Sequence, residues 1–161
     1  MTKTIPTKAD FTTTQKSGET CDALFDGQLR LFQSRSGYRF SLDALLLAGF
    51  VTVKPNDKFA DLGTGSGIVP LLLARREKNI SIVAVECQGA LVERAKRNVR
   101  LNHLADQIEI VRGDVRRIGA VAQPETFDAV VFNPPYRKPG SGRLSPNDEK
   151  QIARHEINGD L

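Results

Sequence analysis

Asp61-Leu62-Gly63-Thr64-Gly65-Ser66-Gly67 is the stretch that decides the fold. It lies between a strand predicted at 58–61 and a helix predicted at 66–77. Its alternating glycines let the backbone turn tightly and approach a ligand, and the N–H groups at a helix start suit a polar or anionic group. A dinucleotide fingerprint needs its third glycine at position 68, where this chain has Ile68, so an NAD-binding interpretation is weakened.

The rest of the chain alternates helices and strands around that turn. The predicted elements are helices at 42–50 and 89–101 and strands at 80–85, 107–111 and 127–132. Apolar strands separated by helices are typical of a parallel sheet, so the predicted fold class is α/β with a doubly wound, mostly parallel sheet. Asp26-Gly27, which stands between two short apolar runs, predicts an N-terminal hairpin with a two-residue turn. Ser41 is the predicted N-cap of the first helix.

Length and composition narrow the classes of protein. The 161 residues fit one domain, with a flexible N-terminal arm predicted at 1–20 and the folded domain at 21–161. No apolar run reaches the ~18 residues of a membrane-spanning helix, which predicts no membrane contact. Cys21 and Cys87 lack metal-ligand spacing, so we predict no metal site and a reducing, cytoplasmic location. The net charge of +4 permits a polyanionic partner.

Three acidic residues come at the ends of successive predicted strands. Asp61 ends the first, Glu86 lies about 20 residues after the glycine turn at the end of the second, and Asp114 follows the third. Open α/β sheets bind ligands at that edge. There Glu86 can accept both hydroxyl hydrogens of a ribose, and Asp114 can accept from an adenine amino group. Asp61 would repel a pyrophosphate and attract an amino group, which favours S-adenosylmethionine over NAD.

Asn133-Pro134-Pro135-Tyr136 ends the last predicted strand. The prolines fix φ and lack N–H donors, which leaves the Pro134 carbonyl and the Asn133 side-chain oxygen as adjacent acceptors for one planar –NH2 group. Such bonds orient the amine and favour its pyramidalisation, so that its lone pair attacks an electrophile without a strong base. Tyr136 offers a ring on which an extruded base can stack.

These motifs resemble those of the class I S-adenosylmethionine-dependent methyltransferases. The closer resemblance is to the bacterial tRNA adenine-N6 methyltransferases that modify the adenine beside the anticodon of a valine tRNA. The resemblance is carried by residues 37–46, the glycine turn, residues 133–136 and Ala153-Arg154-His155-Glu156. It implies a Rossmann-like fold, S-adenosyl-L-methionine as cofactor, and methylation of the exocyclic amino group of adenine in RNA, with tRNA the favoured substrate.

The resemblance also implies a set of site residues. Asp61, Gly63 and Gly65 would hold the methionine part of the cofactor, Glu86 the ribose and Asp114 the adenine, with Phe40 and Ser41 nearby and Asn133, Pro134, Pro135 and Tyr136 around the target adenine. Because the family's catalytic domain continues with further strands, the chain looks like its N-terminal portion.

Two other functions stay open. One is transfer to another planar nitrogen, a protein glutamine N5 or a ribosomal RNA guanine N2; the other is a cofactor-binding fragment without activity. The basic segment 137–154 suits contacts with RNA phosphates. The basic residues of the 89–101 helix are interpreted as a solvent-exposed face: Arg94, Lys96, Arg97 and Arg100.

Overall fold

The computed structural model describes residues 15–120 and 125–134. Its main sheet has four parallel strands in the order β5-β4-β3-β6. The strands are β3 (Lys58–Leu62), β4 (Ser81–Glu86), β5 (Ile108–Arg112) and β6 (Ala129–Phe132). Each begins and ends within two residues of its predicted bounds, which confirms the predicted parallel α/β sheet.

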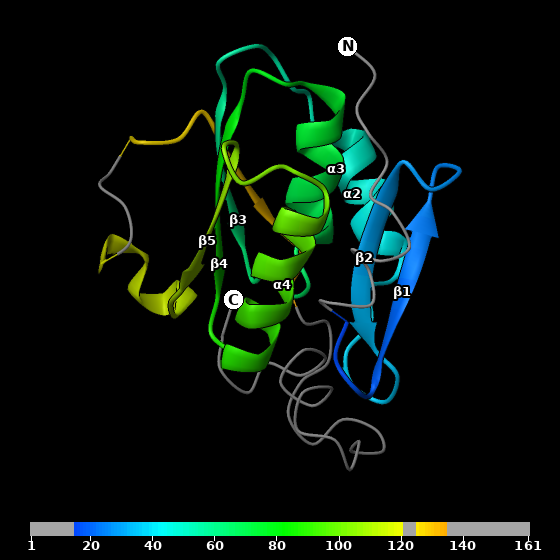
Figure 1. Ribbon diagram of the computed structural model, residues 1–161. Coiled ribbons are helices and arrows are strands. Elements are labelled where there is room, and N and C mark those ends of the chain that lie inside the picture. The colour runs from blue at the N-terminus through cyan, green and yellow to red at the C-terminus, as the bar shows by residue number, and fades with distance from the viewer. Residues whose placement is uncertain (1–14, 121–124, 135–161) are drawn as a thin grey trace.

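Three α-helices lie on one face of this sheet (Figure 1). They are α2 (Leu42–Phe50), α3 (Ile68–Arg76) and α4 (Gly89–Leu101). Phe59, Ile82 and Ile110 project toward them and are buried. Val130 belongs to the opposite face and is 60% exposed, so the second helical layer of a doubly wound sheet is not part of the described residues. Within residues 15–120 and 125–134, no helix is both long and apolar enough to span a membrane.

The helix ends differ in detail from the prediction. Gly67 adopts a left-handed conformation with φ of +85°, so α3 begins at Ile68 rather than at Ser66. Ser41 stands at the N-cap position of α2, but its hydroxyl donates to the Asp43 carboxylate at 2.9 Å instead of accepting a backbone N–H. A 3₁₀ segment, η1 (Val115–Ala120), follows β5 and has no counterpart in the prediction.

The N-terminal hairpin is formed by β1 (Glu19–Leu24) and β2 (Leu29–Ser34), which pair antiparallel. Its loop contains four residues rather than the predicted two, because Phe25 leaves the strand with φ of +52°. The Arg75 guanidinium lies 4.4 Å from the centre of the Phe25 ring. β1 begins at Glu19, two residues before the predicted start of the domain, and residues 1–14 of the predicted arm lie outside the described range.

α4 lies between the main sheet and the hairpin (Figure 1). Val92, Ala95 and Val99 belong to the core that it shares with the sheet. The other buried side of α4 carries polar groups, and Arg94 and Arg97 there both bond the Glu19 carboxylate.

The expected solvent-exposed face of α4 is therefore wrong for two of its four basic residues. The side chains of Arg94 and Arg97 are 8% and 10% exposed, whereas that of Lys96 is 42% exposed. A hairpin strand distant in sequence supplies the counterion, and periodicity within the helix cannot reveal such a partner. The basic segment 137–154 lies outside the described residues.

Candidate functional site

The carboxyl ends of three adjacent strands bring the predicted acids to one edge of the sheet. Leu62 pairs with Val85 and Val85 with Val111, so the ends of β3, β4 and β5 are level. Asp61 is 2% exposed and Glu86 5% exposed. The Asp114 side chain, just beyond β5, is 30% exposed. The predicted convergence of acids is thus present, with two of them buried and the third near the surface.

The glycine turn is fastened to β4 by its backbone. The Thr64 N–H donates to the Val85 carbonyl at 3.0 Å. The Gly65 N–H donates to Glu86 Oε2, also at 3.0 Å. Gly63, Gly65 and Gly67 all have positive φ, between +60° and +85°, a conformation that L side chains rarely adopt. The turn therefore requires glycines, and one of the predicted site acids helps to shape it.

Two of these glycines also face groups of the chain itself. A Cβ on Gly65 would lie 2.8 Å from Tyr38 Cε1, and one on Gly67 would lie 3.4 Å from the Ala95 Cβ. The glycines were predicted to allow a tight turn and a ligand's approach, and internal packing is a further reason why a side chain is excluded at these two positions. Tyr38 was missed as a site residue, although it lies within the 37–46 segment that carries the family resemblance.

Asp61 is a buried carboxylate with an unmet hydrogen-bonding capacity. Within the described part of the chain, Asp61 Oδ2, Thr64 Oγ1 and Ser66 Oγ are buried and have no hydrogen-bond partner. Burial raises the pKa of Asp61 to about 7 and the Glu86 charge adds to the rise. The Thr64 side chain lies near enough to oppose that rise, although the pair does not have the geometry of a hydrogen bond. Such groups are costly to leave unpaired, and together they offer an acceptor for an ammonium group and hydroxyl donors for a carboxylate.

Glu86 and Asp114 already accept bonds from the chain. Glu86 Oε1 accepts from the Gln88 N–H at 2.9 Å, while Oε2 is engaged with the glycine turn. Arg116 contacts both oxygens of Asp114, with Nε at 2.9 Å and 3.1 Å, and its hydrogen bonds lower the pKa of Asp114 to about 2. An ionised carboxylate has about four lone-pair positions, so both acids keep room for a further donor.

The remaining predicted residues come from two segments. Phe40 packs against the core and its N–H donates to Gln33 Oε1 at 3.1 Å, while Ser41 is exposed. Leu62 pairs with Phe132, so Asn133 follows β6 at the level where Gly63 follows β3. Asn133 and Pro134 are half-buried beside the turn, and Pro135 and Tyr136 lie outside the described residues.

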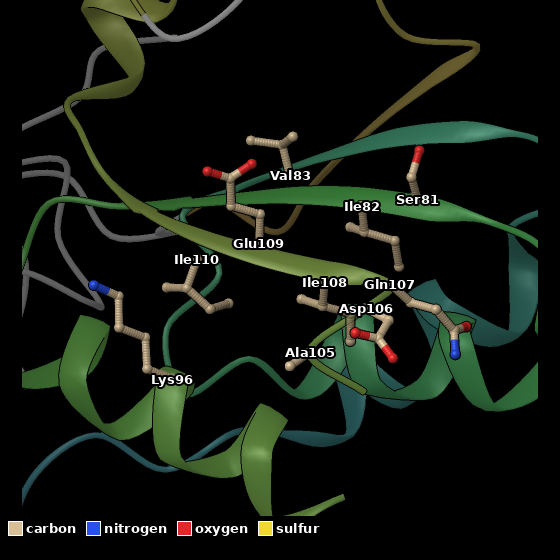
Figure 2. A pocket seen from close by; sticks show the side chains of 10 residues that line it. All are labelled: Ser81, Ile82, Val83, Lys96, Ala105, Asp106, Gln107, Ile108, Glu109 and Ile110. Carbon is tan, nitrogen blue, oxygen red and sulfur yellow. The ribbon is translucent and has the colours of Figure 1, made fainter. Parts of the chain in front are cut away.

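An open hollow of ≈ 530 Å³ lies at the opposite end of the strands (Figure 2). Glu109 and Val83 lie on one side of the strands there, and Ile110 and Lys96 on the other. None of the predicted site residues lines it. Residues 15–120 and 125–134 contain no group of three or more His, Cys, Asp or Glu side chains that could hold a metal ion.

The residues at this edge of the sheet lie within a match to a known protein family. The family model described as Methyltransferase small domain matches residues 39–147, which include the glycine turn, all three acids and Asn133. The chain belongs to the methyltransferase small domain family. The match also covers Pro135 and Tyr136, and it begins one residue after Tyr38.

The relatives of this methyltransferase small domain include RNA-modifying enzymes. The tRNA1(Val) (adenine(37)-N6)-methyltransferase of Haemophilus influenzae is 31% identical over 80% of this chain and 54% of its own length. The protein of the same name from Bacteroides thetaiotaomicron is 32% identical over 80% of this chain and 52% of its own. The chain thus spans about half the length of the relatives it matches.

A solved structure supports the fold of this methyltransferase small domain. TYW2 of M. jannaschii, crystallised in complex with AdoMet, superposes with a TM-score of 0.53 over 63% of this chain and 46% of its own, at 19% identity. That similarity concerns the fold.

Proposed function

We propose that this chain binds S-adenosyl-L-methionine and transfers its methyl group to the exocyclic N6 amino group of an adenine in tRNA. The observation that carries the proposal is the buried Asp61 carboxylate, with Oδ2 unpartnered in the described part of the chain, beside a turn that ends level with Asn133. The family and the names of its relatives support the same reaction.

The residues at the turn fit the amino-acid part of that cofactor. Asp61 would accept from its ammonium group, and the Thr64 and Ser66 hydroxyls would donate to its carboxylate. These are the groups whose hydrogen bonds are unmet, so a ligand that carries both charges satisfies them together. Glu86 would accept from the ribose hydroxyls and Asp114 from the adenine amino group, with the oxygens that Arg116 and the turn leave accessible.

The chemistry needs positioning more than acid or base catalysis. The bound cofactor supplies an electrophilic methyl group on a positively charged sulfur. Asn133 Oδ1 and the Pro134 carbonyl would accept the two N–H bonds of the target amine, orient its lone pair and favour its pyramidal form. The amine nitrogen becomes cationic and acidic on methylation, so its proton passes to water and no histidine is required. Pro135 and Tyr136 would complete this pocket, with the Tyr136 ring stacked on the base.

The test is an Asn133→Ala variant, with Asn79→Ala as a matched control because Asn79 is exposed and belongs to the loop before β4. Methyl-labelled cofactor is incubated with the protein and total tRNA, and label is counted in separated RNA and protein fractions. We expect label in RNA for the parent chain and Asn79→Ala, and loss of transfer with retained S-adenosylhomocysteine binding for Asn133→Ala.

Two outcomes would contradict the proposal. Normal transfer by Asn133→Ala would remove the assigned role of that amide. Label in the protein fraction, or in a guanine of ribosomal RNA, would assign the chain to one of the other planar nitrogens.

A further inference from the structure

Two asparagines, Asn98 in α4 and Asn102 at its C-cap, bond the backbone of β2 as a neighbouring strand would. Asn98 Oδ1 accepts from the Phe32 N–H at 2.6 Å, and its Nδ2 donates to the Phe32 carbonyl at 3.1 Å. One helical turn later, Asn102 Oδ1 accepts from the Arg30 N–H at 3.0 Å and Nδ2 donates to the Arg30 carbonyl at 2.6 Å. Arg30 and Phe32 alternate along β2, so the two side chains satisfy the strand edge that faces away from β1.

Asn98 alone of this pair also reaches the glycine turn. Its Nδ2 donates to the Ser66 carbonyl at 2.9 Å, and the residue is completely buried. One turn earlier on α4, Ala95 packs against Gly67. The Asn98 amide therefore joins the hairpin and the turn through three hydrogen bonds. Among the described residues, the Asn102 side chain bonds only Arg30 and the Asn98 carbonyl.

The hairpin also determines where Tyr38 lies. The Ser34 hydroxyl accepts from the Gly37 N–H at 2.7 Å, and Gln33 Oε1 accepts from the Phe40 N–H at 3.1 Å. These two bonds fasten the chain on both sides of Tyr38 to the end of β2. The Tyr38 ring reaches Gly65 from there, so a shift of β2 relative to α4 would change the separation between that ring and the turn.

We propose that Asn98 is a positioning residue for the cofactor site. Its side-chain amide bonds both the Ser66 carbonyl and the backbone of β2, and it thereby keeps the distance between the glycine turn and the Tyr38 ring fixed. Ligand binding at the turn and docking of the hairpin on α4 are then thermodynamically linked. The inference rests on the proposed function, because the ligand is S-adenosylmethionine.

The test compares Asn98→Ala with Asn102→Ala, because each removes an amide clamp on β2 and only the first removes a bond to the turn. Affinity for S-adenosylhomocysteine is measured by calorimetry at a temperature where both variants are folded. We expect about a tenfold loss for Asn98→Ala and less than about a twofold loss for Asn102→Ala. Asn98→Ser, which leaves a smaller cavity and one hydroxyl, provides an intermediate case if Asn98→Ala does not fold.

Hydrogen exchange gives a readout that a purely structural role would not change. We expect S-adenosylhomocysteine to slow exchange of the β2 amides in the parent chain and in Asn102→Ala, and to lose this effect in the Asn98 variants. Equal affinities of the Asn98 and Asn102 variants, or ligand protection of β2 that survives in Asn98→Ser, would overturn the inference. Failure of the parent chain to bind the ligand would instead overturn the proposed function.

Discussion

Glu19 and Asp61 are both buried carboxylates, yet their pKa values move in opposite directions. Burial alone would raise the pKa of Glu19, but hydrogen bonds from Arg97, the Lys16 N–H and Arg94 outweigh it and lower the pKa to about 2. Asp61 has no cationic partner among the described residues, and burial raises its pKa to about 7. Both residues are 5% exposed or less, but Asp61 lies deeper in the chain. The deeper burial of Asp61 and the donors supplied to Glu19 both contribute to the difference.

The contrast separates a structural acid from a binding acid. Glu19 receives a 3.0 Å bond from Arg94 Nε and a 2.7 Å bond from Arg97 Nη1, which join the hairpin to α4. Asp61 leaves Oδ2 unpaired at the edge where parallel sheets bind ligands. A carboxylate that the fold itself neutralises stabilises the fold, whereas one left unpaired there is available to a cationic ligand.

The largest effect we expect comes from Glu19→Gln, which removes the buried carboxylate charge that Arg94 and Arg97 share. Breaking a buried ion pair on one side costs about 3–5 kcal/mol, and urea unfolding at pH 7 measures the loss. Asp22→Asn is the matched control, because Asp22 pairs with the 40% exposed Arg39 at the surface and we expect a loss below about 1 kcal/mol.

The stabilising contribution of Glu19 also depends on pH, in a direction that follows from its lowered pKa. Because the pKa of Glu19 is lowered in the folded chain, its contribution is complete above pH 4.5 and is lost as the pH falls toward about 2. Equal stabilities of Glu19→Gln and Asp22→Asn would show that the buried pair is not a structural link.

Asp61→Asn tests whether Asp61 is a binding acid rather than a structural one. The substitution keeps the size and one acceptor oxygen but removes the charge that would meet the ligand's ammonium group. We expect affinity for S-adenosylhomocysteine to fall about tenfold to a hundredfold, because a hydrogen bond between charged groups is lost. Stability at pH 8 should not fall, since the variant removes an uncompensated buried charge.

Calorimetry and urea unfolding on the same preparation separate the two effects. Asp106→Asn serves as control, since Asp106 is exposed at the other end of the sheet. Unchanged affinity in Asp61→Asn would remove Asp61 from the binding site, and a large loss of stability would place it with Glu19 among the structural acids.

The smallest expected effect is the pH dependence of ligand affinity. With a pKa of about 7, part of the Asp61 population is protonated below neutral pH and lacks the negative charge that attracts the ligand's ammonium group. Affinity for S-adenosylhomocysteine should therefore weaken by up to about tenfold between pH 7.5 and pH 6, while the ligand's own amino group stays charged. Glu86, the neighbouring acid, faces the same site and stays in place in every variant.

In the unliganded chain the raised pKa has the opposite consequence for folding. Between pH 4 and 7 the folded state keeps the Asp61 proton that the unfolded state has lost, so this group's contribution to stability falls as the pH rises. Asp61→Asn should abolish both slopes. Persistence of either slope in that variant would assign the titration to another group.

The sequence predicted those features of the fold and the site that depend only on local pattern and on the order of the strands. Continuous apolar runs located β3 to β6, and helical pattern located the bounds of α2 and α4. The convergence of Asp61, Glu86 and Asp114 followed from the rule that parallel strands end at one edge. The roles of the individual site residues stay predictions that the proposed variants test.

The sequence by itself determined the order of elements and the chemical character of the acids and of Asn133-Pro134. Only the tertiary structure decided which charges are neutralised and what the glycines face. Glu19 meets Arg94 across 75 positions of the chain and Asn98 meets Phe32 across 66, and Tyr38 covers Gly65 from another segment. Pattern within a helix or strand records which side is buried, but it does not record which distant group lies against that side, and that group fixes the pKa and the hydrogen bonding of a buried polar residue.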